Sequence, residues 1–145
     1  SQPLDFYKSL IGARDIKVIP DETYSLLSAS EAALVTSGTA TLETALLNIP
    51  EVVCYKGGAV SYHIAKRIVD IKYISLVNLI MDKEVVKELI QDDLNEQTIF
   101  IELKKILSLE HRINLLADYA ELRKKLGGSG ASAKAAKIIQ DFMNN

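Results

Sequence analysis

Apolar and polar positions follow two alternating periods along the first half of the chain. Short apolar, β-branched runs predict strands, and stretches with apolar residues three and four apart predict helices. The predicted strands cover residues 15–19, 33–36, 51–55 and 73–76, and the predicted helices between them cover 22–30, 39–47 and 59–69. Strands that alternate with helices at this spacing are typical of a parallel sheet. The sequence therefore predicts a Rossmann-like α/β fold with helices on both faces of the sheet.

The second half of the chain has helical periodicity almost throughout. Helices are expected over 84–90, 96–107, 110–126 and 131–143, with residues 110–145 as a helical tail behind the α/β domain. A glycine-rich break at 127–130 separates the last two helices. No strand precedes this break and it lacks the Gly-Lys-Ser/Thr ending of a phosphate-binding loop, so a helix C-cap with a hinge is the better interpretation.

The most informative segment is 34–47, where an apolar run ends at Ser37-Gly38-Thr39 and a helical pattern begins at once. The first N–H groups of a helix lack intrahelical partners and lie at the positive end of the helix dipole, so this turn suits a diphosphate. Glu43, one turn further on, is placed to accept hydrogen bonds from a sugar hydroxyl. Ser, Gly and Thr are also ordinary turn and cap residues, so the motif alone leaves both interpretations open.

Two further loops are expected beside this turn, because parallel sheets bind ligands at the carboxyl ends of their strands. The loop at 56–58 and Asn78 each follow a predicted strand. Lys56 is a candidate for neutralising a diphosphate, and a solvated surface lysine is an equally good interpretation. The predicted helix 59–69 carries an apolar stripe beside Lys66 and Arg67, which fits a core face or an anionic membrane surface.

Composition bounds the partners and cofactors. The chain has 145 residues and a formal net charge of −2, which does not favour nucleic acid as a partner. Cys54 is the only cysteine and lies in an apolar run, so we expect a reduced thiol in a cytoplasmic protein. With two separated histidines, His63 and His111, no zinc site is expected. The opening residues, which lack a Met, predict an excised domain.

Several segments, taken in order, resemble one family, the lipid-A-disaccharide synthases. The resemblance runs from about Asp15 onward. It is carried by residues 37–43 (SGTATLE), Pro50, 52–56 (VVCYK), 62–67 (YHIAKR), 73–80 (YISLVNLI), 84–91 (EVVKELIQ) and 126–132 (LGGSGAS).

The resemblance implies one half of a GT-B fold, in which two Rossmann-like domains face each other across a cleft. Residues 1–145 would be the C-terminal, nucleotide-sugar-binding domain of an inverting glycosyltransferase. The enzyme joins UDP-2,3-diacylglucosamine to 2,3-diacylglucosamine 1-phosphate and releases UDP, a step of lipid A biosynthesis in Gram-negative bacteria. The lipid acceptor and the general base would belong to an N-terminal domain that the chain lacks, so this fragment is expected to be inactive.

The same resemblance assigns roles to individual residues. Ser37, Gly38 and Thr39 would face the diphosphate, and Glu43 would hold the ribose hydroxyls. Asn78, in a motif that usually reads Pro-Asn-Leu but has valine before Asn78 here, would lie near the donor sugar or phosphates. Gln91 would be a further polar residue near the cleft. No metal is implied, since Asp-x-Asp is absent and the adjacent pair 92–93 fits a solvated or helix-capping position.

The resemblance also implies partners and a location. The family is expected to form homodimers through C-terminal helices and to contact the membrane peripherally, on the inner face of the inner membrane, because both substrates carry acyl chains. Two alternatives remain open. One is another UDP-sugar enzyme of the same fold, such as a UDP-N-acetylglucosamine epimerase, and the other is a non-catalytic dimerisation module.

Overall fold

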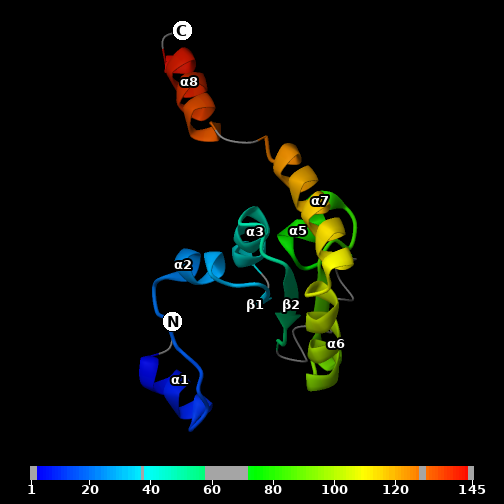
Figure 1. The fold of residues 1–145 in the computed structure, drawn as a ribbon. Coiled ribbons are helices and arrows are strands. Elements are labelled where there is room, and N and C mark those ends of the chain that lie inside the picture. The colour runs from blue at the N-terminus through cyan, green and yellow to red at the C-terminus, as the bar shows by residue number, and fades with distance from the viewer. Residues whose placement is uncertain (1–2, 37, 58–71, 128–129, 144–145) are drawn as a thin grey trace.

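The computed structural model describes residues 3–36, 38–57, 72–127 and 130–143. Its centre is a parallel sheet of β1 (Ala33–Thr36), β2 (Glu51–Tyr55) and β3 (Lys87–Ile90), in that spatial order. Figure 1 labels β1 and β2 of this sheet. The strands at 33–36 and 51–55 have the predicted bounds. The middle strand β2 pairs Val53 with Val35 of β1 on one side and with Glu88 of β3 on the other.

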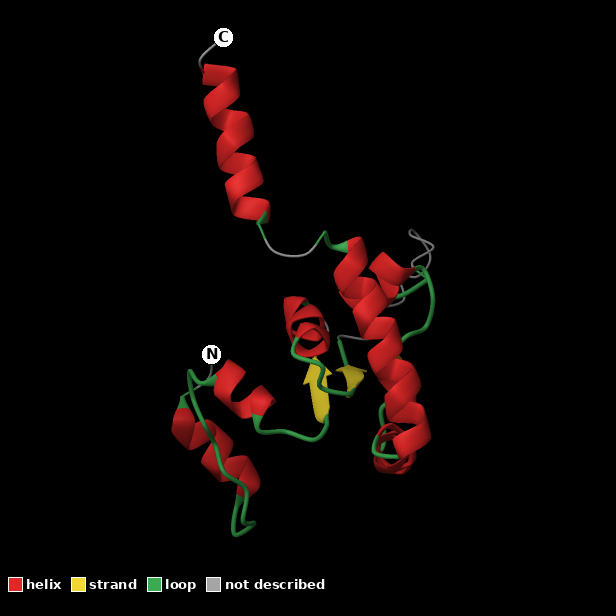
Figure 2. Cartoon of the chain, turned by 45° about the horizontal axis from the view of Figure 1, so that its top comes forward, coloured by secondary structure: helices red, strands yellow, loops and turns green. Residues whose placement is uncertain are grey.

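Helices make up most of the remaining described residues (Figure 2). They are α1 (Leu4–Ile11), α2 (Thr23–Ser28), α3 (Thr39–Leu46), α5 (Leu76–Met81), α6 (Glu96–Ile106), α7 (Leu109–Lys125) and α8 (Ala131–Met143), with a short 3-10 turn, η1 (Gln91–Asp93). The predicted helices at 22–30, 39–47, 96–107, 110–126 and 131–143 are confirmed with small shifts of their ends. The predicted helix 59–69 lies outside the described residues.

Two hydrophobic cores lie on opposite faces of the sheet. Successive residues of a strand point to opposite faces, and Val53 accordingly packs with residues of α3, α5 and α7, whereas Val52 packs with Leu89 and with Ile106 of α6. Both valines are fully buried. The predicted α/β fold with helices on both faces is therefore confirmed.

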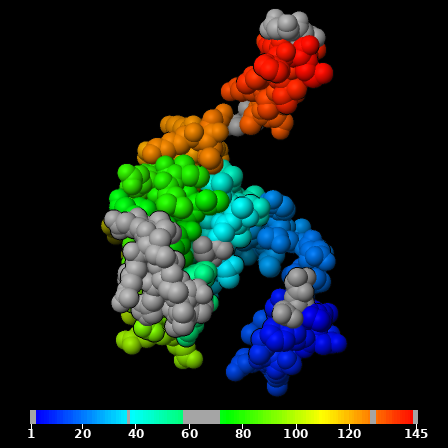
Figure 3. All heavy atoms as spheres, turned by 180° about the vertical axis from the view of Figure 1, so that it is seen from behind, coloured from blue at the N-terminus to red at the C-terminus, as the bar shows by residue number. Residues whose placement is uncertain are grey.

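Helix α7 belongs to the main core, and α8 stands apart from it. Leu115, Tyr119 and Leu122 of α7 are buried in the core that contains Val53 of β2. Arg123 of α7 also donates from Nη2 to the carbonyl of Leu46, 2.6 Å away, at the end of α3. In contrast, α8 has no buried residue and extends away from the body of the chain (Figure 3). Only the last part of the predicted tail at 110–145 is thus separate from the domain.

Three predicted elements are wrong. Residues 15–19 have no regular secondary structure and pair with no strand of the described sheet, and Ile16 and Ile19 are exposed. Residues 73–76 are not a strand, because Ser75 is the N-cap of α5 and its side chain accepts from the N–H of Asn78. Residues 84–90 are not a helix, because 87–90 form β3; pairing with β2 overrides the helical preference of Lys, Glu and Leu.

Candidate functional site

The carboxyl edge of the sheet brings together the loops that follow all three strands. Gly38 follows β1, Lys56 follows β2 and Gln91 follows β3. Because Tyr55 pairs with Ile90, the last residues of β2 and β3 are neighbours and the two loops start side by side. Parallel pairing places the loops after β1 and β2 at the same edge of the sheet, as the sequence predicted. Gln91 follows β3 at this edge, whereas Asn78 lies in α5.

The turn after β1 opens the N-terminus of α3. Gly38 is the N-cap residue, with φ 135° and ψ −160°, a conformation that residues with a Cβ rarely adopt. No side chain caps this helix end among the described residues, although Thr41 donates from Oγ1 to the carbonyl of Gly38 at 2.8 Å. Ser37 lies outside the described residues, and Thr39 is exposed. The N–H of Thr41 donates to the Gly38 carbonyl at 3.3 Å, and within the described residues no side chain occupies the helix end, a position that suits an anionic ligand.

Glu43 lies four residues after Thr39, on the same face of α3. Its side chain is half-buried, and no hydrogen bond or ion pair holds its carboxylate within the part of the chain that the structure describes. The carboxylate is thus available to accept hydrogen bonds one turn from the open helix end. Lys56, in the neighbouring loop, is exposed, and its ammonium is a positive charge in the loop after β2.

Gln91 is tied to the loop after β2. Its Oε1 accepts from the N–H of Gly57 at 3.2 Å, and its Nε2 donates to the carbonyl of Gly57 at 3.3 Å. Gln91 itself has a φ of 53°, in the left-handed region. The structure therefore joins two of the predicted site positions, the loop at Lys56 and Gln91, through a pair of side-chain-to-backbone hydrogen bonds.

Asn78 lies away from this edge. Its Nδ2 donates to the carbonyl of Val86 at 2.8 Å and to Oε1 of Glu88 at 2.9 Å, and its Oδ1 accepts from the N–H groups of Val85 and Val86. These bonds use both donors and both lone pairs of the amide, and the residue is fully buried. Val86 precedes β3 and Gln91 follows it, so roughly 16 Å of strand separates them. In this structure Asn78 fastens α5 to the start of β3.

Glu88 was not predicted to have a role. Its carboxylate accepts from the N–H groups of Ile74 and Ser75, at 3.0 and 2.9 Å, and from Asn78. It thereby satisfies backbone donors at the start of α5. The available sequence signal was an acidic residue beside the apolar pair 89–90, which is unusual for a strand in contact with a core.

Glu51 is a buried acid at the opposite edge of the sheet, where β2 begins. It is fully buried, and neither carboxylate oxygen has a hydrogen-bond partner among the described residues. Burial raises the pKa of Glu51 to about 9, so the carboxyl is neutral at pH 7. The hydroxyl of Tyr119 is likewise buried without a partner in the described structure. Burial raises the pKa of this hydroxyl above its ordinary value. The Glu51 side chain also borders a cavity of about 60 Å³ that His111 and Lys105 line.

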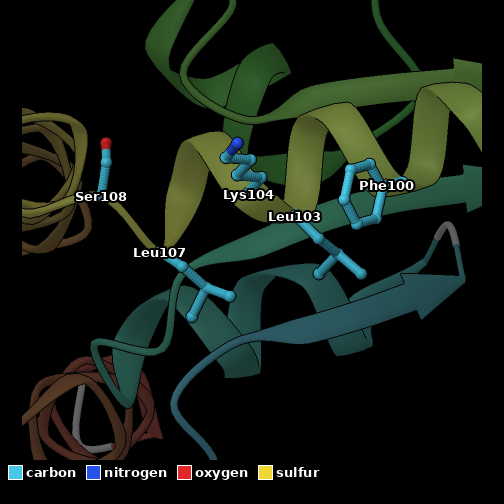
Figure 4. A pocket seen from close by; sticks show the side chains of 5 residues that line it. All are labelled: Phe100, Leu103, Lys104, Leu107 and Ser108. Atoms are coloured by element: carbon cyan, nitrogen blue, oxygen red, sulfur yellow. The ribbon is translucent and has the colours of Figure 1, made fainter.

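A larger groove lies on the surface of α6 and the turn after it. Its volume is about 440 Å³, and Figure 4 shows the side chains that line it: Phe100, Leu103, Lys104, Leu107 and Ser108. None of these residues was predicted to bind a ligand. Within the described ranges, no three His, Cys, Asp or Glu side chains are grouped so that they could hold a metal ion. In those same ranges, no helix has the length and hydrophobicity needed to cross a bilayer.

The parallel sheet with helices on both faces defines a Rossmann-like α/β domain, a class of fold in which ligands bind at the carboxyl ends of the strands. The family model described as Lipid-A-disaccharide synthetase matches residues 8–142. The chain therefore belongs to the lipid-A-disaccharide synthase family of glycosyltransferases, which act in lipid A biosynthesis. The family resemblance seen in the sequence is confirmed.

Similar proteins cover almost all of the chain. It is 42% identical over 122 residues to a lipid-A-disaccharide synthase of Syntrophus aciditrophicus, which covers 83% of this chain and 32% of that protein. It is 38% identical over 131 residues to a lipid-A-disaccharide synthase of Acidobacterium capsulatum, with 88% and 32% covered. A lipid-A-disaccharide synthase of Vibrio campbellii is 38% identical over 129 residues, with 87% and 34% covered. The chain spans about a third of the length of these relatives.

Proposed function

We propose that the chain is the donor-binding half of an inverting GT-B glycosyltransferase. It binds the UDP part of UDP-2,3-diacylglucosamine at the carboxyl edge of β1–β2–β3. The sugar is transferred to 2,3-diacylglucosamine 1-phosphate, which a separate N-terminal domain holds together with the general base. Support comes from membership of the family and from the names of the similar proteins.

The observation that carries the proposal is the start of α3 at Gly38, where no described side chain caps the helix, with Glu43 one turn away. The diphosphate binds the free N–H groups of the helix, and the ribose hydroxyls donate to the Glu43 carboxylate. In glycosyl transfer, negative charge grows on the departing UDP. Helix-end N–H groups and the ammonium of Lys56 stabilise this charge by electrostatics that are in place before the reaction. The proposal requires no metal ion or other cofactor.

Calorimetric titration of the chain with UDP tests the proposal, with ATP and GDP as matched nucleotides. We expect UDP to bind and the two purine nucleotides to bind much more weakly or not at all. A folded chain that does not bind UDP contradicts the proposal. Equal binding of all three nucleotides contradicts the uridine preference and favours a less specific nucleotide-binding domain.

A second role, self-association, is favoured by α8. This helix has no buried residue. Four large apolar side chains near its C-terminal end are exposed: Ile138, Ile139, Phe142 and Met143. We propose that α8 packs against a second copy of the chain and that the assembled enzyme contacts the inner membrane peripherally. Sedimentation velocity of the chain with and without residues 131–145 tests the first point, since the shortened chain should stay monomeric. Equal association of both forms contradicts it.

A further inference from the structure

The loop after β2 is held from two sides. On one side, the side-chain amide of Gln91 makes reciprocal hydrogen bonds to the N–H and the carbonyl of Gly57. On the other, the ring of Tyr55 lies so close to the Cα of Gly57 that an added Cβ would be 2.9 Å from the Tyr55 hydroxyl oxygen. Gly57 thus lies between an amide and an aromatic ring, and a side chain at this position would have to displace the exposed Tyr55 ring.

These contacts fix the backbone around Lys56. This residue lies between Tyr55, the last residue of β2, and the restrained Gly57. The Gln91 amide therefore links the residue after β3 to the second residue after β2, beyond the ladder that ends at Tyr55 and Ile90. A glycine loop without such a restraint samples many backbone conformations, and ordering it on binding a ligand costs affinity.

We propose that Gln91 is a positioning residue for the nucleotide donor, which acts through the loop at Lys56 and Gly57 and not through a contact of its own. The role rests on the proposed function, because it requires Lys56 to face the diphosphate. Gln91 follows β3, and Lys56 follows β2, so the amide links two of the three loops at the ligand edge. By ordering the loop, Gln91 fixes the backbone from which the Lys56 side chain extends toward the donor.

The Gln91→Asn variant tests this role. Asparagine keeps a neutral amide and tolerates the left-handed backbone at this position, but it is one methylene shorter and does not reach Gly57. We expect UDP affinity to fall about tenfold, the effect of losing roughly one or two ordering hydrogen bonds. The amide of Gly57 should also exchange with solvent faster. Gln97→Asn, on the exposed side of α6, is the matched control and should leave UDP affinity unchanged.

A double-mutant cycle with Lys56→Ala separates positioning from direct contact. If Gln91 acts through the lysine loop, Gln91→Asn should weaken UDP binding less than twofold when Lys56 is already alanine. An undiminished loss in that background shows a direct contact and overturns the inference. Wild-type affinity in Gln91→Asn also overturns it, even if the melting temperature falls. A folded wild-type chain that binds no UDP overturns the proposed function and the positioning role with it.

Discussion

The side chain of Asn78 is hydrogen-bonded to both backbone groups of Val86. Its Nδ2 donates to the Val86 carbonyl at 2.8 Å, and its Oδ1 accepts from the Val86 N–H at 2.9 Å. The asparagine side chain thus pairs with the backbone before β3 as a neighbouring strand would.

Asn78→Ala should destabilise the fold strongly. The substitution removes the acceptor of the buried Val86 N–H and the donor to the Val86 carbonyl and to Glu88, whereas the Val85 N–H keeps its bond to the Lys83 carbonyl. Each buried unpaired group costs about 1–3 kcal/mol, so we expect a loss of about 3 kcal/mol or more in the free energy of unfolding. Urea unfolding measures it. Asn114→Ala, on an exposed position of α7, is the control, and a similar small change in both variants would contradict the role described for Asn78.

Glu43→Ala should weaken UDP binding with little change in stability. The carboxylate has no partner among the described residues, so its removal breaks no internal bond there. Losing hydrogen bonds between a charged group and the ribose costs about 1.5–3 kcal/mol, or roughly tenfold to a hundredfold in affinity. Calorimetric titration and a melting curve measure the two effects. Glu121→Ala on α7 is the control, and unchanged UDP affinity in Glu43→Ala would refute the ribose role.

Glu51→Gln should raise the free energy of unfolding above that of the wild type, by an amount that grows as the pH rises from 5 to 9. The folded pKa of Glu51 is raised from 4.5 to about 9, so the folded chain holds a proton that the unfolded chain releases. Its contribution to stability is complete below about pH 4.5 and is lost as the pH rises through 9, at about 1.4 kcal/mol per pH unit. At pH 7 the glutamine variant should therefore be more stable by up to about 3 kcal/mol.

Unfolding in urea at pH 5, 6, 7 and 8 checks the Glu51 prediction. The wild-type chain should lose stability relative to Glu51→Gln at each step. Parallel pH profiles for the two proteins would show that Glu51 is ionised in the folded state. Glu84→Gln, an exposed position near the same edge of the sheet, is the matched control and should follow the wild-type profile.

Gly38→Ala should reduce both stability and UDP affinity. A Cβ at this position would meet no atom within 4 Å, so the cost comes from the backbone conformation at φ 135° and not from a clash. Such strain costs about 1–3 kcal/mol, and relieving it would tilt the first N–H groups of α3. Melting curves and UDP titration measure the two effects. Gly127→Ala, also at a positive φ but past the end of α7, should lower stability while leaving UDP affinity intact.

The sequence predicted the parts of the fold that local pattern decides. Strands β1 and β2 are apolar runs that end at glycine-containing turns, and both have the predicted bounds. The segment 84–90 fits helical spacing equally well, and only its pairing with β2 makes it a strand. The same limit applies to the site. The turn at Gly38 is a local motif, whereas the partner of Gln91 is Gly57, 34 residues away, which no local pattern reveals.

The central strand has consequences for the ligand edge. Val52 and Val53 are sealed on opposite faces of β2, and the same strand continues directly into Lys56. Two separate packing layers thus share one strand, which ends at the proposed diphosphate site. We expect the loss of even one methyl group from either core to change the affinity for the donor. Donor affinity can therefore evolve through core residues that do not contact the ligand.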